Sequence, residues 1–448
     1  MAQVKITFIG AGSGGFTLSQ VNAICRTRNL HGSIISLMDI NEDRLNDTHV
    51  ICDRFVEQMG VDVKFEKTLD RREALKGADF VINTALLHGA RRLNQGWTIA
   101  EKHGVKWGGS YHILYDEPFW LNYYQLQLFE GIAQDMLELC PDAWLLLISN
   151  PVLAGTTFLT RKYPELKMVG LCGADAGVYE IAAVLGLERE HITYEVPGVN
   201  HFIWLTKMYY KGQDVFPMID RWLETEAESY WEKHPEGEMG MKKMDLYRNL
   251  GAIPIGDSAS ITGASWPWWY HSSKEVEKRW RTDSREWWYE YAEEVRKAPE
   301  EFKRLVQDES HEYVRAYEGH EGHGLQIPII ESIACDIPRT FITNIQNTNE
   351  FVAGVPRDFE VEIPTLISRR GVQGIKTDGL PKAIIAHLLR DRVAPVEIEL
   401  EAYQEGSRNL LTHLVMTDNW ITSQKQAEDL IDEIFSLPYH GELREHYC

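Results

Sequence analysis

The feature that most constrains the fold is a glycine-rich segment that directly follows the first apolar run of the chain. Val4–Ile9 has the composition of a buried strand, and Gly10-Ala-Gly12-Ser13-Gly-Gly15 comes next. This spacing is that of the GxGxxG turn between a strand and a helix, where glycines let the backbone approach a pyrophosphate at the positive helix end. The segment predicts a dinucleotide site at Gly10, Gly12, Ser13 and Gly15.

Two further polar residues follow strand-like runs near this turn. Asp39 ends the second run at the expected distance, and its carboxylate would accept hydrogen bonds from ribose hydroxyls and repel a 2′-phosphate, which favours NAD over NADP. Asn83 ends another run, where a strand's carboxyl end would border the cofactor crevice. The alternatives are structural: a glycine turn of another α/β fold, a helix cap at Asp39 and a turn residue at Asn83.

Short apolar runs alternate with helix-length amphipathic segments through the first half of the chain, which predicts a parallel, doubly wound sheet. Strands are expected at Val4–Ile9, Ile34–Asp39, Asp79–Thr84, Trp144–Ser149 and Lys167–Leu171. From His191 to Lys211 the pattern is that of antiparallel strands around a turn at Pro197-Gly198. We expect an α/β fold with two domains. A Rossmann-like NAD-binding domain of the lactate/malate dehydrogenase kind would span residues 1–195, and a mixed α+β domain for substrate, metal and oligomerisation would span residues 196–448.

The net charge of the chain limits the kinds of partner it can bind, and its cysteines indicate the cellular compartment. The chain carries 46 Lys and Arg against 67 Asp and Glu, a formal charge of −21, which argues against nucleic acid and anionic membranes as partners. No basic segment followed by a long apolar one opens the chain, and no apolar run approaches the roughly 18 residues that span a bilayer. The six cysteines lack CxxC spacing, which indicates reduced thiols and a cytoplasmic protein.

Cys172 and His201 each follow a strand-like run, where ligands and catalytic groups of open α/β sheets gather. A thiolate and an imidazole together suit a borderline or softer divalent metal that keeps positions free for substrate oxygens. Taken singly, a cysteine is usually a small buried hydrophobe and a histidine a hydrogen-bonded structural residue. Both interpretations stay open on spacing alone.

Two loop aspartates are candidate acid and base groups. Asp116 lies between aromatic residues that could exclude water and raise the pKa of its carboxyl group, and Asp257 follows a Pro and a Gly. The alternative for each is a helix N-cap.

Together these segments resemble glycoside hydrolase family 4, the NAD- and Mn-dependent α-glucosidase, α-galactosidase and α-glucuronidase family. The resemblance runs through most of the chain, and its motifs are Ile9–Ser13, Ser36–Ile40, Asp79–Ala85, Ser149–Val152, Val169–Cys172, Gly198–His201 and Pro254–Asp257. Within the family the chain looks most like α-glucosidases of unphosphorylated glycosides, with α-glucuronidases and α-galacturonidases close by. The alternative from another class is an NAD-dependent sugar or hydroxy-acid dehydrogenase, which shares the N-terminal sheet.

The resemblance implies a glycoside hydrolase that works by oxidation at carbon 3, elimination of the aglycone, addition of water and re-reduction, with NAD and Mn²⁺ or another divalent metal. Carried over by motif, Cys172 and His201 look like metal ligands, Asp116 like the general acid and Asp257 like the base for the proton on carbon 2. The amides Asn150 and Asn200 look like substrate contacts. The resemblance also suggests a homodimer or homotetramer.

The chain departs from the family directly after the proposed metal cysteine. Close relatives have His there, whereas this chain has Gly173-Ala174-Asp175, and it also lacks the Asn-Val-Pro or Asp-Met-Pro of the phospho-glycosidases. Asp175 could bind a sugar hydroxyl and would repel a carboxylate or phosphate, which favours a neutral sugar. Alternatively, Asp175 caps the following helix.

Overall fold

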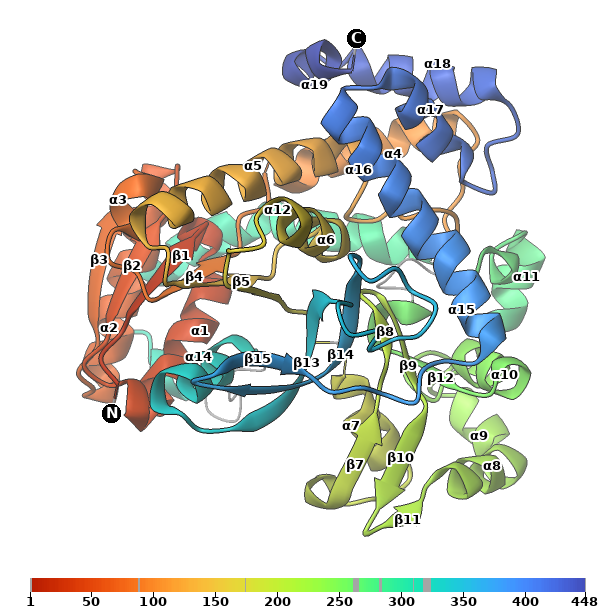
Figure 1. The fold of residues 1–448 in the computed structure, drawn as a ribbon, viewed down its shortest axis with the longest axis horizontal. Helices are drawn as coiled ribbons and strands as arrows, with labels where there is room; N and C mark the ends of the chain where they lie inside the picture. The colour runs from red at the N-terminus through yellow and green to blue at the C-terminus, as the bar shows by residue number, and fades with distance from the viewer. Residues whose placement is uncertain are drawn as a thin grey trace.

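Six parallel strands form one half of the main sheet in the order β3-β2-β1-β4-β5-β6 (Figure 1). In this computed structural model the described residues are 2–87, 89–173, 175–260, 266–281, 284–308, 310–316 and 324–447. The order is that of the dinucleotide-binding sheet, so the expected Rossmann-like fold is confirmed. The six strands are β1 (Lys5–Ile9), β2 (Ile34–Met38), β3 (Lys64–Thr68), β4 (Phe80–Asn83), β5 (Trp144–Leu147) and β6 (Met168–Gly170).

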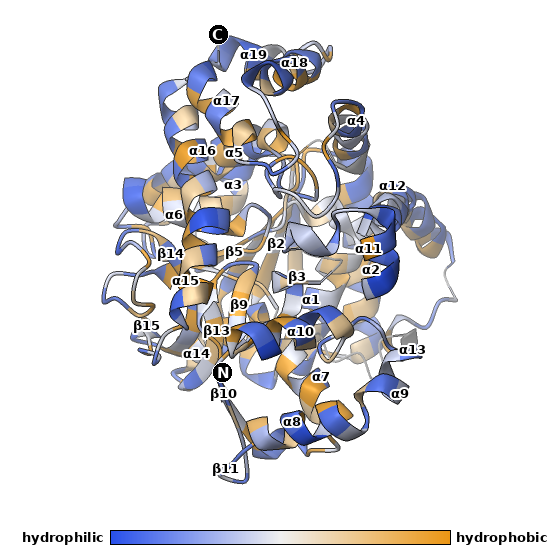
Figure 2. Cartoon of the chain, turned by 90° about the vertical axis from the view of Figure 1, so that its right-hand side faces the viewer, coloured by the Kyte–Doolittle hydropathy of each residue, from blue (hydrophilic) through white to orange (hydrophobic). Residues whose placement is uncertain are grey.

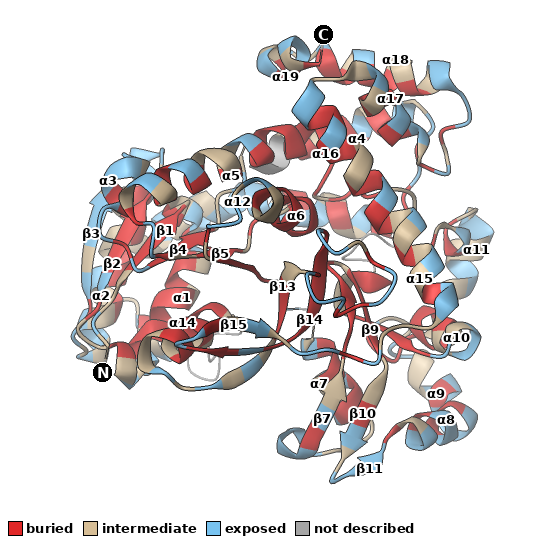
Figure 3. Ribbon diagram, viewed as in Figure 1, coloured by how far each residue is buried: buried red, intermediate tan, exposed pale blue. Residues whose placement is uncertain are grey.

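Alternate residues of these strands face two different cores. In β4, Val81 packs in the core shared with α5 (Phe119–Leu139), whereas Ile82 packs in the core shared with α1 (Gly15–Arg26). Burial on both faces makes these strands mostly apolar, and for that reason their positions can be predicted from the sequence (Figures 2 and 3). The edge strand β3 is mostly exposed and polar and therefore carries no such signal.

The second half of the chain extends the same sheet with antiparallel strands. Next to β6 lie, in order, β13, β14, β8, β9 and β12, and β15 pairs with the outer part of β14. Their bounds are β8 (Gly198–Val199), β9 (Phe202–Leu205), β12 (Ile253–Ile255), β13 (Arg339–Gln346), β14 (Glu360–Ser368) and β15 (Gly371–Gly374). A small separate sheet contains β7 (Ile192–Glu195), β10 (Lys207–Tyr210) and β11 (Gln213–Asp214). One sheet thus runs through both halves, and the division after residue 195 stays a prediction.

The sequence correctly indicated antiparallel strands between His191 and Lys211 but placed the turn wrongly. β7 pairs with β10, and Pro197-Gly198 leads from the small sheet into the main one. The tight turn lies at Asn200 and His201, between β8 and β9, which pair with each other. Gly198 serves a close approach instead, because a Cβ there would lie 2.2 Å from the carbonyl oxygen of Phe202.

Helices cover both faces of the sheet, and the C-terminal helices α16 to α19 gather beside α4 and α5 (Figure 1). Among the described residues, no helix combines the length and apolarity needed to cross a bilayer. Ala174, in the segment that departs from the family, lies outside the described residues. The remaining helices are α2 (Glu42–Met59), α3 (Arg71–Leu75), α4 (Gly89–Lys102), α6 (Val152–Lys162), α7 (Ala176–Val184), α8 (Phe216–Thr225), α9 (Ala227–Trp231), α10 (Met241–Leu250), α11 (Lys274–Trp280), α12 (Ser284–Gln307), α13 (Tyr313–Ala316), α14 (Gln326–Cys335), α15 (Lys382–Leu388), α16 (Ala394–Glu405), α17 (Arg408–Met416), α18 (Gln424–Phe435) and α19 (Gly441–His446).

Candidate active site

The glycine-rich turn joins β1 to α1 and leaves no room for side chains at two positions. Gly10 has a φ of +90°, and a Cβ there would lie 2.7 Å from backbone atoms of Ala85. The Gly12 N–H donates to Oδ2 of Asp39 at 2.8 Å, and a Cβ on Gly12 would lie 2.7 Å from the same oxygen. Ser13 is exposed beside them, and no atom lies within 4 Å of a Cβ built on Gly15. Such a turn at a helix N-terminus fits a pyrophosphate.

Asp39 and Asn83 have different surroundings. The Asp39 carboxylate is half-buried and also accepts a hydrogen bond from the Asn41 N–H at 2.8 Å, so it is oriented at the end of β2. Asn83 is fully buried and donates from Nδ2 to Oγ of Ser149 at 2.9 Å. Its side chain therefore links the ends of β4 and β5, and its role toward a cofactor stays a prediction.

Three potential metal ligands converge from different strands of the extended sheet. Cys172 follows β6, His201 lies in the β8–β9 turn with a φ of +57°, and Asp257 follows β12. Their ligand atoms all lie within 4.8 Å of one another. Thiolate, imidazole and carboxylate are ordinary ligands of divalent transition metals, so this donor set fits the metal that the sequence predicted. The structure places Asp257, the predicted base, directly beside the predicted metal pair.

The imidazole of His201 lies between two carboxylates. Its Nε2 is 3.9 Å from Oδ2 of Asp257, and its Nδ1 is 3.7 Å from Oε1 of Glu117. Glu117 is buried, and burial together with the neighbouring Asp116 carboxylate raises its pKa well above the usual range. Sequence analysis missed Glu117, because a glutamate beside a proline carries no local signal of burial against a distant histidine.

Asp116 lies next to this cluster and is held by Asn150. The Asn150 Nδ2 donates to Oδ2 of Asp116 at 2.6 Å, and Gln125 in turn donates to the carbonyl oxygen of Asn150 at 2.7 Å. Burial raises the pKa of Asp116, although the positive field of His201 and the hydrogen bond from Asn150 oppose this shift. The structure thus brings Asp116 and Asn150 together, which sequence spacing alone did not show.

Asn200 and Asp175 are engaged with protein groups. Asn200 is 1 % exposed and donates from Nδ2 to Oε2 of Glu362 at 3.2 Å. Burial raises the pKa of Glu362 to about 8. Asp175 accepts a hydrogen bond from the Tyr194 hydroxyl at 2.8 Å and makes no cap hydrogen bond to α7. Roles of Asn200 and Asp175 toward substrate stay predictions.

Two cavities meet at Cys172 and Gly173, which line both of them. One, of about 530 Å³, extends past Asp257 and is called the Asp257-side cavity. The other, of about 490 Å³, is lined by His201 and Asn150 as well as by residues of α1 and α14. The metal cluster therefore lies where two spaces of ligand size join.

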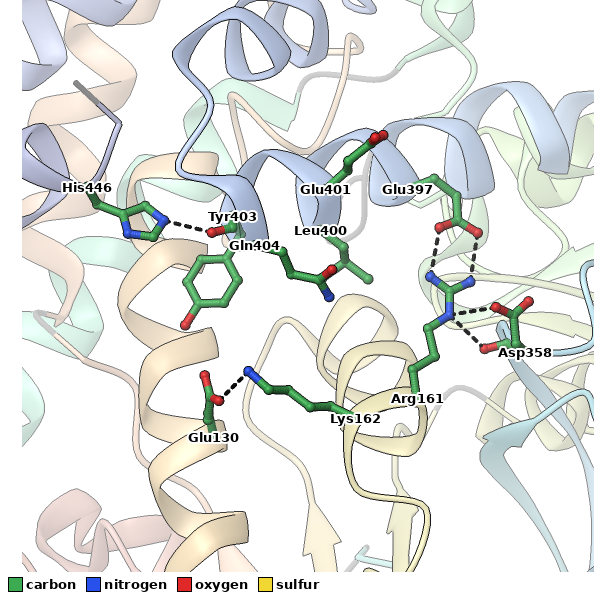
Figure 4. Close-up of a pocket in the computed structure, with 10 residues that line it drawn as sticks. All are labelled: Glu130, Arg161, Lys162, Asp358, Glu397, Leu400, Glu401, Tyr403, Gln404 and His446. Atoms are coloured by element: carbon green, nitrogen blue, oxygen red, sulfur yellow. Dashed lines mark hydrogen bonds and ion pairs between the residues drawn. The ribbon is translucent and has the colours of Figure 1, made fainter.

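A larger cavity of about 750 Å³ lies elsewhere, between α5, α6 and α16 (Figure 4). Its charged side chains pair with each other: Arg161 donates to both carboxylate oxygens of Glu397, and Lys162 contacts Glu130. The cavity at the metal cluster, despite its smaller volume, is therefore the better candidate for chemistry.

Comparison with known proteins gives the family. The family model described as "Family 4 glycosyl hydrolase" matches residues 5–187, and "Family 4 glycosyl hydrolase C-terminal domain" matches residues 196–421. The chain belongs to family 4 of the glycosyl hydrolases. The resemblance seen in the sequence is confirmed.

Among family 4 relatives, an α-glucosidase of Erwinia rhapontici is 26% identical, with 96% of this chain and 97% of the relative covered. An α-galacturonidase of Thermoanaerobacterium saccharolyticum is 24% identical, with coverage of 96% and 95%. The 6-phospho-β-glucosidase of Thermotoga maritima, solved with manganese, NAD⁺ and glucose-6-phosphate, has a TM-score of 0.75 at 19% identity, with coverage of 96% and 97%. Lactate dehydrogenase from Eimeria maxima shares the fold at a TM-score of 0.54 and 14% identity, with coverage of 91% and 96%.

Proposed function

We propose that this family 4 enzyme hydrolyses an unphosphorylated α-glycoside with the help of NAD and a divalent metal such as Mn²⁺. The observation that carries the proposal is the convergence of Cys172, His201 and Asp257 where two cavities meet. The relatives support it, because curated ones are named α-glucosidase and α-galacturonidase, and a solved one contains NAD⁺ and manganese. A sugar would bind in the cavity that is lined by Cys172 and His201 and by residues of α1, the helix that follows the glycine turn.

Each residue has a role that its surroundings allow. When bound, NAD supplies reversible oxidation of a sugar carbon, and the metal supplies Lewis-acid stabilisation of the neighbouring oxygens. Cys172 and His201 would hold the metal, and Glu117 would orient the imidazole from its other nitrogen. Asp257 would take the proton from carbon 2. Asp116, whose raised pKa keeps it protonated to higher pH, would give a proton to the leaving oxygen.

The cofactor preference follows from the turn. Gly10, Gly12, Ser13 and Gly15 would bind the pyrophosphate, and the oriented carboxylate of Asp39 would receive ribose hydroxyls. The same carboxylate would repel a 2′-phosphate, so NAD would be preferred over NADP.

The decisive experiment separates glycoside hydrolysis from net oxidation. The protein with NAD⁺, Mn²⁺ and a thiol reductant should release nitrophenol from a nitrophenyl α-glycoside without accumulating NADH. Asp257→Asn should abolish release, whereas Asp142→Asn, at an aspartate whose side chain is 99% exposed, should not. Steady NADH formation without released aglycone would favour the dehydrogenase instead.

We also propose that the enzyme works in the cytoplasm as a homodimer or homotetramer. Support for a reducing compartment comes from the described cysteines, none of which is joined in a disulfide. Light scattering of the purified protein tests the assembly, and a monomeric mass would contradict it.

A further inference from the structure

Lys242 is a buried ammonium group in the wall of the Asp257-side cavity. It is 4% exposed and lies in the first turn of α10. Its Nζ has no hydrogen-bond acceptor among the described residues. A buried ammonium without an acceptor is destabilising, so its presence beside the metal cluster requires a reason.

Lys243, the next residue, also lines this cavity, but its ammonium group has both hydrogen-bond acceptors and a counter-charge. Lys243 donates from Nζ to Oε1 of Glu238 and to the carbonyl oxygen of Gly256, both at 2.7 Å. Glu238 also accepts a hydrogen bond from the Gly256 N–H at 3.3 Å. These two charges cancel each other within the wall, whereas the charge on Lys242 is left without such a partner.

The other ionisable groups that line the cavity do not offer that partner. Glu180 is exposed and Glu236 is half-buried, and the charge of Glu236 acts on Lys242 although the Lys242 Nζ donates no hydrogen bond to it. Burial and the charge of Lys243 lower the pKa of Lys242 to about 7, while Glu236 opposes this shift. The ionisable residues that line the Asp257-side cavity are Cys172, Glu180, Glu236, Glu238, Lys242, Lys243 and Asp257.

We propose that Lys242 binds a singly charged oxyanion of the substrate, such as a sugar carboxylate, so that the enzyme acts on α-uronosides. This inference rests on the proposed glycosidase function and names its substrate class. An oxyanion would give the buried ammonium both a counter-charge and a hydrogen-bond acceptor. A cavity of about 530 Å³ is within the size range of small-molecule sites.

The charges that line the cavity favour a substrate group with one negative charge over a phosphate dianion or a neutral sugar. A phosphate dianion would bring two charges to a single free ammonium, with the carboxylates of Glu236 and Asp257 in the same wall. A neutral hexose would leave the ammonium without a counter-charge. The expected repulsion by Asp175 does not oppose a carboxylate here, because Asp175 is hydrogen-bonded to Tyr194 and does not line this cavity.

The test compares matched glycosides on the holoenzyme with NAD⁺ and Mn²⁺. The parent should show a higher kcat/KM for nitrophenyl α-glucuronide or α-galacturonide than for the corresponding hexosides and 6-phosphohexosides. Lys242→Met should lower kcat/KM for the uronide by on the order of 10- to 100-fold, the worth of one hydrogen bond to a charged group, and leave the hexoside unchanged. The control Lys382→Met, at an exposed lysine in the first turn of α15, should leave both unchanged.

A second measurement does not require turnover. Calorimetric titration with D-glucuronate and D-galacturonate, with D-glucose as reference, should show uronate binding to the parent that Lys242→Met weakens. Equal losses on uronide and hexoside, or a parent preference for hexosides or phosphates, would overturn the inference and leave the glycosidase function standing. If no glycoside is cleaved, the proposed function fails, and uronate binding that depends on Lys242 still decides the inference.

Discussion

The Nζ of Lys243 lies 2.7 Å from Oε1 of Glu238, and both side chains are buried beside Gly256, the residue before Asp257. Lys243→Met would leave the Glu238 carboxylate without its counter-charge. We expect a loss of about 3–5 kcal/mol in the free energy of unfolding, measured by urea denaturation. The double variant Lys243→Met/Glu238→Gln should recover much of this loss, because it removes both charges. A loss of under about 1 kcal/mol in the single variant would contradict a buried, structurally required pair.

The lowered pKa of Lys242 makes its effect on stability depend on pH. The pKa of Lys242 is about 7 in the folded chain, whereas the ordinary lysine value of 10.5 applies to the unfolded chain. Between pH 7 and pH 10.5 the unfolded chain therefore binds more protons than the folded chain. The destabilisation is therefore complete below pH 7 and disappears as the pH rises toward 10.5. Lys242→Met should raise the free energy of unfolding by a few kcal/mol at pH 6.5 and by much less at pH 9.5. A gain independent of pH would contradict a buried, titrating ammonium.

Metal affinity should depend on the thiolate of Cys172. Cys172→Ser should weaken Mn²⁺ binding by more than the roughly 10–100-fold that changes outside the ligand shell cost, because a hydroxyl is a poor replacement for a thiolate. Titration followed by electron paramagnetic resonance measures free Mn²⁺ directly. Cys335→Ser, at a cysteine in α14 outside the metal cluster, is the control and should bind as the parent does. Activity that persists in excess EDTA would argue against the site.

The role proposed for Asp116 predicts a dependence on the leaving group. Asp116→Asn should slow hydrolysis of alkyl glycosides by on the order of 10²–10⁴-fold, the usual contribution of a general acid. Nitrophenyl glycosides should be much less affected, because nitrophenolate leaves without protonation. Steady-state kinetics on both substrates give the comparison. Equal losses on both would assign Asp116 to positioning of Asn150 or His201 instead.

The glycine turn allows steric effects to be separated from cofactor contact. Gly15→Ala should fold like the parent, because nothing lies within 4 Å of the added Cβ, yet it should weaken NAD⁺ binding if the backbone there approaches the pyrophosphate. Gly441→Ala, where the added Cβ also meets nothing within 4 Å, is the matched control. Fluorescence titration with NADH measures the affinity. Unchanged affinity in Gly15→Ala would place the cofactor away from this residue.

The sequence was informative wherever the physics is local. Strands buried on both faces are mostly apolar, so β1, β2, β4, β5 and β6 were each expected within two residues of their observed ends. The exposed edge strand β3 has no such composition and was not expected. A Pro-Gly pair marks turns in general, and it misled here because Gly198 is required by a close approach of Phe202 rather than by a hairpin.

For the candidate site, spacing and family resemblance named Cys172, His201, Asp116 and Asp257 but not their arrangement. Only the packing of distant strands showed that Asp257 joins the cysteine and the histidine, and only the packing of α7 against β7 showed that Asp175 is hydrogen-bonded to Tyr194. Glutamates and lysines are normally exposed, so nothing local marks Glu117 or Lys242 as buried.

By itself, then, the sequence determined the parallel sheet, the glycine turn and the residue types available for metal and acid–base chemistry. Buried strands require apolar residues and tight turns require glycine, so both can be recognised from composition and spacing. The tertiary structure alone decided which charges lie together and which lack a partner. Burial of an ionisable group depends on segments far apart in the chain, 162 residues for Asn200 and Glu362 and 84 residues for Glu117 and His201. That dependence on long-range packing is the physical reason why Lys242 became visible only in the folded chain.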